Sequence, residues 1–221
     1  NRRGAGHRSP KSVLEGPLAS VKMFDQWYLT FVASRVNFWG IRPSFRKREF
    51  LMFEPPLLNA AEQRVMGVLI EKSLATPQYY PLTLNQVVTA CNQKSNRDPV
   101  MSLMEDEVEG VLNTLANRGL ATQVFASGSR AGKYRQELTG MLELNGQEMA
   151  VLAEFLLRGA QTVGELRTRA SRMKSIPDMA ALNEVLQGLA GKDQPLARRL
   201  TPPGIQRGVR WGHLLQDAAL L

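Results

Sequence analysis

Hydrophobic and polar positions form one pattern that occurs twice after residue 57. The sequence Leu58–Glu62 recurs as Leu144–Glu148, 86 residues later. In both copies an Asn is followed three residues later by a Glu, the capping box that begins a helix. Apolar residues at helical spacing then predict an amphipathic helix in each copy. They are Ala61, Val65, Val68 and Leu69 in the first copy and Met149, Leu152, Phe155 and Leu156 in the second.

A middle helix, a third helix and a hairpin are predicted to follow in each copy. Thr83 and Thr162 are expected to cap the two middle helices. The third helices have apolar residues at i, i+3, i+4 and i+7, which are Val108, Val111, Leu112 and Leu115, repeated 74 residues later as Leu182, Val185, Leu186 and Leu189. Short alternating segments then predict two-stranded hairpins. These segments are Leu120–Ala126 with Lys133–Thr139, and Leu196–Thr201 with Val209–Leu214.

This order of elements predicts a mainly α fold with small β-wings, built as two winged-helix domains in tandem. Three short helices and a hairpin enclose one small core in each domain. The first domain is expected over residues 52–142 and the second over residues 143–221. Residues 1–51 lack helical periodicity and are expected to be a poorly structured N-terminal extension. The sequence favours Met52 as the natural start, with residues 1–51 outside the natural protein.

The net charge of +8 belongs almost entirely to the first 51 residues. That segment has 10 basic and 3 acidic residues, a net charge of +7, and the remainder has 18 basic and 17 acidic residues, a net charge of +1. Bulk charge therefore says little about the partner of the two domains. For residues 1–51, a basic arm that binds nucleic acid and an organelle transit peptide are the functional alternatives.

The blocks Thr89–Val100 and Leu157–Arg167 are the most distinctive parts of the sequence. Together with Tyr80–Leu82 they resemble the uncharacterised bacterial YceH-like family. The likeness extends from about Leu57 to Trp211 and does not include residues 1–51. Membership of this family implies two winged-helix domains and no established activity.

Residue types that support catalysis or metal binding are scarce. Cys91 is the single cysteine, and the two histidines, His7 and His213, lie near opposite ends of the chain. These residues offer no disulfide, no zinc-ligand spacing and no nucleophile–base arrangement. No apolar run approaches the roughly 20 residues that span a bilayer. The sequence therefore predicts a non-enzymatic cytoplasmic protein with no cofactor, metal, small-molecule substrate or membrane partner.

Neither third helix has the composition of a DNA-reading helix. In winged-helix proteins this helix commonly enters the major groove, where Arg, Lys, Asn and Gln read the bases. The first third helix begins with the acidic residues Glu105, Asp106, Glu107 and Glu109, and the second, Met179–Ala190, has no Arg or Lys. We therefore expect little sequence specificity.

Basic residues collect instead on the wings, on the loop after the first middle helix and on the middle helix of the second domain. Phosphate contacts from these positions would give salt-sensitive binding, and an ordinary solvated surface is the alternative. The candidate nucleic-acid-binding residues are Lys94, Asn96, Arg97, Arg130, Lys133, Arg135, Arg167, Arg169, Arg172, Lys174, Arg207 and Arg210.

The sequence thus favours a nucleic-acid-associated accessory or regulatory factor, with DNA and RNA both open as partners. The alternative is a protein-interaction or dimerisation scaffold that docks on a larger assembly, which the acidic third helices favour. The polar loop Asn92–Pro99 is open to two interpretations. Its side chains either hold the backbone of the loop itself or form a recognition surface.

Overall fold

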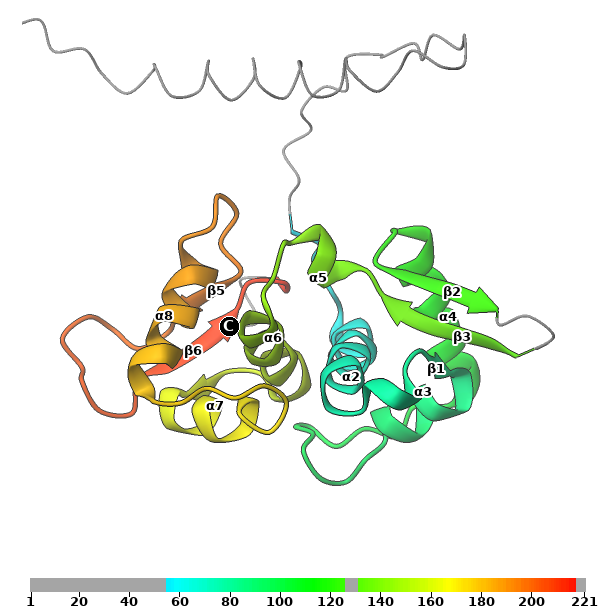
Figure 1. The fold of residues 1–221 in the computed structure, drawn as a ribbon, viewed down its shortest axis with the longest axis horizontal. Coiled ribbons are helices and arrows are strands. Elements are labelled where there is room, and N and C mark those ends of the chain that lie inside the picture. Colours follow the sequence, from blue (N-terminus) through cyan, green and yellow to red (C-terminus); the bar gives the residue numbers. More distant parts are fainter. Residues whose placement is uncertain (1–54, 126–130, 218–221) are drawn as a thin grey trace, which may run out of the picture. The chain divides into compact units, whose positions relative to one another are not determined.

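The computed structural model describes residues 55–125 and 131–217. These residues belong to one unit of the chain, residues 52–221. Within this unit the same series of elements occurs twice (Figure 1). Residues 55–142 are called the first half below, and residues 143–217 the second half.

Each half contains three principal helices and three short strands. In the first half these are α2 (Ala60–Ala75), β1 (Leu82–Thr83), α3 (Leu84–Cys91), α4 (Glu105–Asn117), β2 (Ala121–Phe125) and β3 (Gly132–Gln136). In the second half they are α6 (Gly146–Arg158), β4 (Gln161–Thr162), α7 (Val163–Ala170), α8 (Met179–Ala190), β5 (Ala197–Arg199) and β6 (Arg210–His213). A 3-10 turn, η1 (Pro77–Tyr79), and a short helix, α5 (Leu138–Met141), complete the described elements.

Each half has one antiparallel sheet, and the two sheets have equivalent strand orders, β1-β3-β2 and β4-β6-β5. The predicted mainly helical fold with small β elements is thus confirmed. The prediction of two-stranded hairpins was incomplete, because each sheet has a third strand, which lies before the middle helix in sequence. That strand has only two residues, too few for an alternating pattern to reveal it. The predicted strand Lys133–Thr139 was also too long, since Leu138 begins α5.

The predicted helix caps are present. The side chain of Asn59 accepts a hydrogen bond from the Glu62 amide at 3.0 Å, and the Glu62 carboxylate accepts one from the Asn59 amide at 2.9 Å. Asn145 and Glu148 repeat this geometry at the start of α6. Each box satisfies amide groups that the first turn of a helix leaves without partners. Thr83 and Thr162 cap the middle helices in the same way.

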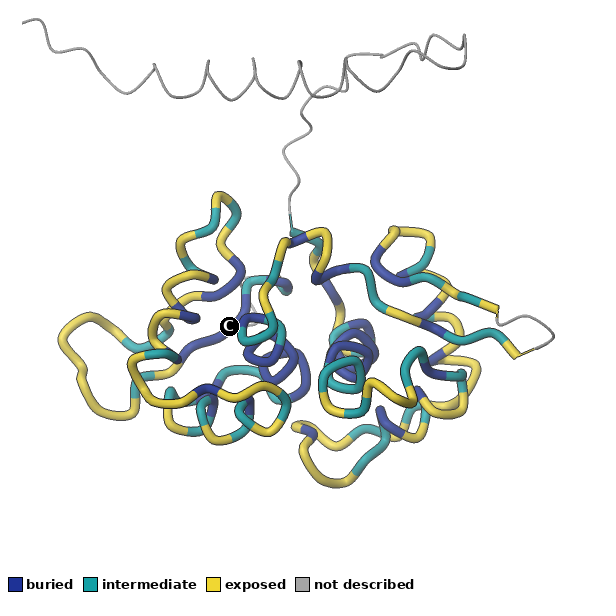
Figure 2. The backbone as a smooth tube through the Cα atoms, viewed as in Figure 1, coloured by how far each residue is buried: buried dark blue, intermediate teal, exposed yellow. Residues whose placement is uncertain are grey.

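Helices α2 and α6 lie side by side at the centre of the unit and contain its longest unbroken runs of buried residues (Figure 2). Gly67 of α2 permits their close approach, because a Cβ atom at this position would lie 2.9 Å from Cγ of Leu157. Two backbone hydrogen bonds also join the halves, from Leu58 to Leu215 at 2.8 Å and from Asp98 to Leu157 at 3.0 Å. The two halves therefore share one continuous hydrophobic core.

Within residues 55–125 and 131–217, no helix has the length and apolar composition to cross a bilayer.

Candidate nucleic-acid interface

The loop after α3 is held from inside by two buried arginines. Arg64 of α2 donates hydrogen bonds to the carbonyls of Cys91 and Pro99. The Arg97 side chain, which has no exposed surface, donates to the Ala90 carbonyl at 3.0 Å and to both oxygens of Glu71. Because its guanidinium is enclosed by the protein, Arg97 does not lie on the surface where it was expected to meet nucleic acid.

The same loop is closed by Asn92 and joined to the second half by Asn96. The Asn92 side chain exchanges two hydrogen bonds of 2.8 Å with the backbone of Leu103. Asn96 has a positive φ of 59° and accepts hydrogen bonds from Arg158 and Arg172. Its side chain therefore bridges the halves. Lys94 is exposed and is the loop residue best placed to meet a ligand.

Four predicted cations lie on or after α7, and three of them donate hydrogen bonds within the protein, Arg172 to the Asn96 side chain. Arg167 donates to the Pro177 carbonyl. Arg169 pairs with Glu165 at 3.2 Å and also donates to the Gln161 side chain. Arg172 and Lys174 are exposed. This group consequently presents two of its four charges openly.

The first wing offers little free positive charge. Arg130 lies outside the described residues. Lys133 of β3 is half-buried, and Arg135 forms an ion pair with Glu137 at 2.8 Å.

The second wing has four exposed arginines. Arg207 and Arg210 are exposed, as predicted, and so are Arg198 and Arg199 at the end of β5, which were not predicted. Arg199 donates to the Ile205 carbonyl and Arg210 to the Ala160 carbonyl, so Arg198 and Arg207 have the freer guanidinium groups. Residues 194–216 contain these four arginines and no Asp or Glu. Strand β5 is an edge strand, so arginine side chains there can extend into solvent. The adjacent pair Arg198-Arg199 within a predicted hairpin was the signal that could have revealed them.

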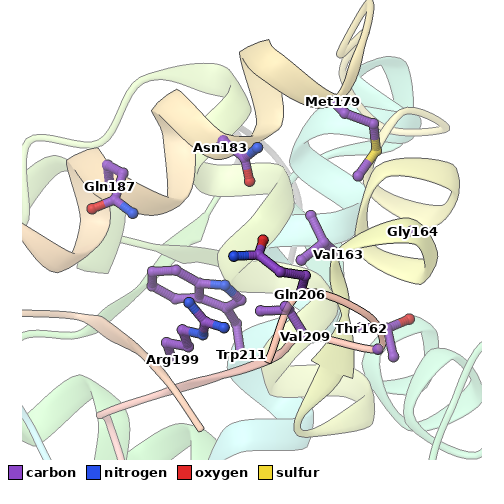
Figure 3. A pocket seen from close by; sticks show the side chains of 11 residues that line it. Thr162, Val163, Gly164, Met179, Asn183, Gln187, Arg199, Gln206, Val209 and Trp211 are labelled. Atoms are coloured by element: carbon purple, nitrogen blue, oxygen red, sulfur yellow. The ribbon is translucent and has the colours of Figure 1, made fainter. Parts of the chain in front are cut away.

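A hollow with a volume of about 590 Å³ lies between α8, the start of α7 and the second wing (Figure 3). Asn183 and Gln187 line it from α8, Arg199 and Gln206 from the wing, and Trp211 from β6. Thr162, Val163, Gly164, Met179, Gly208 and Val209 complete the lining. None of these described lining residues is acidic, so the hollow presents amide groups, an indole and a guanidinium without a competing carboxylate.

The corresponding third helix of the first half, α4, is strongly acidic. Glu105, Asp106 and Glu107 occupy the first turn of α4 and are exposed. The cation at the end of the helix, Arg118, is paired with Glu62 at 2.9 Å. Carboxylates stabilise a helix start through the helix dipole, but they repel phosphate. The two halves therefore present different surfaces from equivalent elements.

The chemically reactive side chains lie in the interior. Cys91 is fully buried, and desolvation raises the pKa of its thiol to about 12. His213 is also buried, and desolvation lowers the pKa of its imidazole to about 4. No group of three or more His, Cys, Asp and Glu residues suited to a metal ion occurs in the described part of the chain.

Comparison with known proteins places this arrangement in a family. Residues 58–204 match the family model described as "Protein of unknown function, DUF480". The chain belongs to this family. It is 54% identical over 159 residues to a UPF0502 protein of Geobacter sulfurreducens, with 72% of each chain covered. It is 49% identical over 165 residues to one of Klebsiella pneumoniae, covering 72% of this chain and 76% of the relative.

The UPF0502 protein YceH of Salmonella paratyphi B is 47% identical over 162 residues, with 71% of this chain and 75% of the relative covered. The resemblance to the uncharacterised bacterial YceH-like family is thus confirmed. The block Thr89–Val100, which carried that resemblance, contains the carbonyls and side chains that hold the loop after α3. For Asn92 and Arg97, the DUF480 fold therefore supports the structural interpretation of this loop.

Proposed function

We propose that this chain is a non-enzymatic, nucleic-acid-associated factor built from two winged-helix domains, residues 52–142 and 143–221. The domain proposal is supported by the order helix, strand, helix, helix, strand, strand in both halves. It is also supported by the equivalent strand orders, in which β2–β3 and β5–β6 are the wings. A cytoplasmic location is part of the proposal, and a single buried cysteine agrees with a reducing compartment.

The observation that carries the proposed binding is the second wing. Its four exposed arginines lie in a segment of 23 residues, 194–216, without a carboxylate. Arginine contacts with phosphate give affinity through counterion release and carry no sequence information. Arg172, Lys174 and Lys94 add exposed charge elsewhere on the unit. The factor is accordingly expected to bind with strong salt dependence and little sequence preference.

A protein-interaction role for the first half is the second candidate. Its third helix is acidic, and the Met104 and Phe125 side chains are 66% and 62% exposed. Exposed apolar side chains next to charged residues are typical of protein-binding surfaces. Binding of nucleic acid by the second half and of a protein by the first are compatible, because they use different elements.

The experiment that tests the proposed function is a fluorescence anisotropy titration of labelled single-stranded and duplex nucleic acid with the full chain at 50 and 200 mM salt. The test variant is Arg198→Gln/Arg207→Gln, which removes two exposed charges from the wing. We expect weaker binding and a salt slope lower by about 2, one for each lost phosphate contact. The matched control is Lys133→Gln/Arg135→Gln on the first wing, which should bind as the unmodified chain does.

Circular dichroism melting curves of both variants check that the fold is retained. Absence of binding by the unmodified chain at 50 mM salt would overturn the proposed function. Equal affinities of the second-wing variant and the unmodified chain would overturn the assignment to this wing.

A further inference from the structure

The hollow beside α8 is concave and lined by groups that recognise a base edge. Asn183 and Gln187 are one helical turn apart on α8, and both are exposed. They share the hollow with Gln206 and Arg199 from the wing, around the indole of Trp211 (Figure 3). Asparagine and glutamine amides supply both a donor and an acceptor, which matches the mixed hydrogen-bonding edges of nucleobases.

The outer face of α8 has a different composition. The buried residues Leu182, Val185, Leu186 and Leu189 define the core-facing side of this helix. At 100° per residue, Ala180, Glu184 and Gln187 lie on the opposite side and are exposed. A helix that enters a major groove leads with this outer face. This face therefore has a single amide, that of Gln187, beside a methyl group and a carboxylate, and the carboxylate would be repelled by phosphates.

The size of the hollow also suits a single base. Its volume of about 590 Å³ lies within the range of small-molecule sites, roughly 300–1,000 Å³. A base pair within a duplex has its faces covered by its neighbours, so a concave site has access only to an unpaired base. Proteins that bind single strands combine an aromatic contact for the base with a basic track for the backbone. In the hollow the aromatic part is Trp211, of which only 6% is exposed, and the adjoining arginines of the second wing supply the basic track.

We propose that the hollow between α8 and the second wing binds one unpaired nucleobase of a single-stranded nucleic acid. The base contacts the small exposed part of Trp211 and forms hydrogen bonds with the amides of Asn183 and Gln187. Arg199 faces the neighbouring phosphate, and the strand continues along the wing arginines. This inference rests on the proposed function, because the backbone contacts are those of the second wing.

The test uses the full chain with Trp27→Phe and Trp39→Phe, so that Trp211 is the sole tryptophan. Its fluorescence is measured while a single-stranded oligonucleotide, the same strand with abasic sites, or a duplex is added at 50 mM salt. We expect the single strand to quench Trp211 and to bind at least about tenfold more tightly than the abasic strand, as loss of one base–aromatic contact predicts. The abasic strand should bind through the wing without quenching.

Two matched variants test the lining. Asn183→Ala/Gln187→Ala should reduce the preference for the strand with bases, because the hydrogen bonds to the base are lost, and both positions are exposed, so the fold should be retained. Glu184→Gln, on the outer face of the same helix, should leave that preference unchanged. Equal affinity for the normal and abasic strands, or tighter binding of the duplex, would overturn the base site and leave wing binding intact. Absence of binding by every probe would overturn the proposed function as well.

Discussion

The guanidinium of Arg97 and the carboxylate of Glu71 form a two-point contact, with Nη1–Oε1 at 3.1 Å and Nη2–Oε2 at 2.7 Å. The two residues are 26 positions apart, and the pair fixes the loop after α3 against helix α2. Both Arg97 and Arg64 donate hydrogen bonds to backbone carbonyls at the end of α3 and in this loop, so buried side chains hold the loop backbone in place. Lys94 and Asn96 are among the residues that form the exposed side of the loop.

Removal of Arg97 is expected to destabilise the fold. The Arg97→Ala variant leaves the Glu71 carboxylate without its main partner in a site that is 14% exposed. Breaking such a pair costs about 3 kcal/mol of unfolding free energy or more, and urea denaturation measures it. The matched control is Lys94→Ala in the same loop, expected to change stability by less than about 0.5 kcal/mol. Equal stability of the two variants would contradict the structural role of Arg97.

Close packing of α2 against α6 leads to a prediction at Gly67. Gly67→Val places a branched side chain against Leu156 and Leu157, where even a Cβ atom would be 3.0 Å or less from their side-chain atoms. We expect a loss of about 1–3 kcal/mol in unfolding free energy, the usual effect of overpacking. Gly110→Ala in α4 is the control, because no atom lies within 4 Å of the added Cβ. That variant should gain up to about 1 kcal/mol from helix propensity. A Gly67→Val chain as stable as the unmodified one would refute the close contact.

Burial of His213 predicts a dependence of stability on pH. The imidazole Nδ1 accepts a hydrogen bond from the Leu215 amide, and desolvation lowers the pKa from 6.5 to about 4 in the folded protein. Between these pH values the unfolded chain binds a proton that the folded chain does not. The free energy of unfolding should therefore decrease as the pH falls from 6.5 toward 4, by up to about 3 kcal/mol.

His213→Asn retains a hydrogen-bond acceptor and does not titrate in this range. Urea denaturation midpoints of both proteins are measured at pH 7.5, 6 and 5. Both proteins have the same carboxylates, so any difference between their pH profiles comes from His213. The unmodified chain should lose more stability than the variant over this interval. Parallel pH profiles would rule out His213 as the cause.

The Cys91 thiol is expected to be unreactive in the folded protein. It is fully buried, and its pKa of about 12 leaves almost no thiolate near neutral pH. Because the thiolate is the reactive form, iodoacetamide at pH 8 should leave the native chain unmodified and label it once in 6 M guanidinium chloride, as intact mass would show. Rapid native labelling would indicate that the helix end at Cys91 opens readily.

Local sequence signals predicted the helices well. The capping boxes at Asn59 and Asn145 act between residues three positions apart, so a pattern of neighbours is sufficient to find them. The same holds for the apolar faces of α4 and α8. The strands β1 and β4 were missed because their pairing partners, Tyr134 and Trp211, lie about 50 residues away.

Candidate surface residues were predicted less well, because exposure is a property of the packed chain. A list of basic residues could not separate Arg97, whose partner is 26 residues distant, from Lys94 in the same loop. It also overlooked Arg198 and Arg199, which are exposed at the edge of a sheet whose strand order only the fold defines. The hollow beside Trp211 combines segments from Thr162 to Trp211 that have no contiguous pattern in sequence.

The sequence by itself determined the repeat of helices, their caps, their buried faces and the family, because each depends on residues close together along the chain. Only the tertiary structure decided that α2 and α6 pack through Gly67, that Arg97 is buried, and that the free positive charge gathers on the second wing. The physical reason is that burial and ion pairing depend on which distant segments meet. The order of residues along the chain does not by itself specify these tertiary contacts.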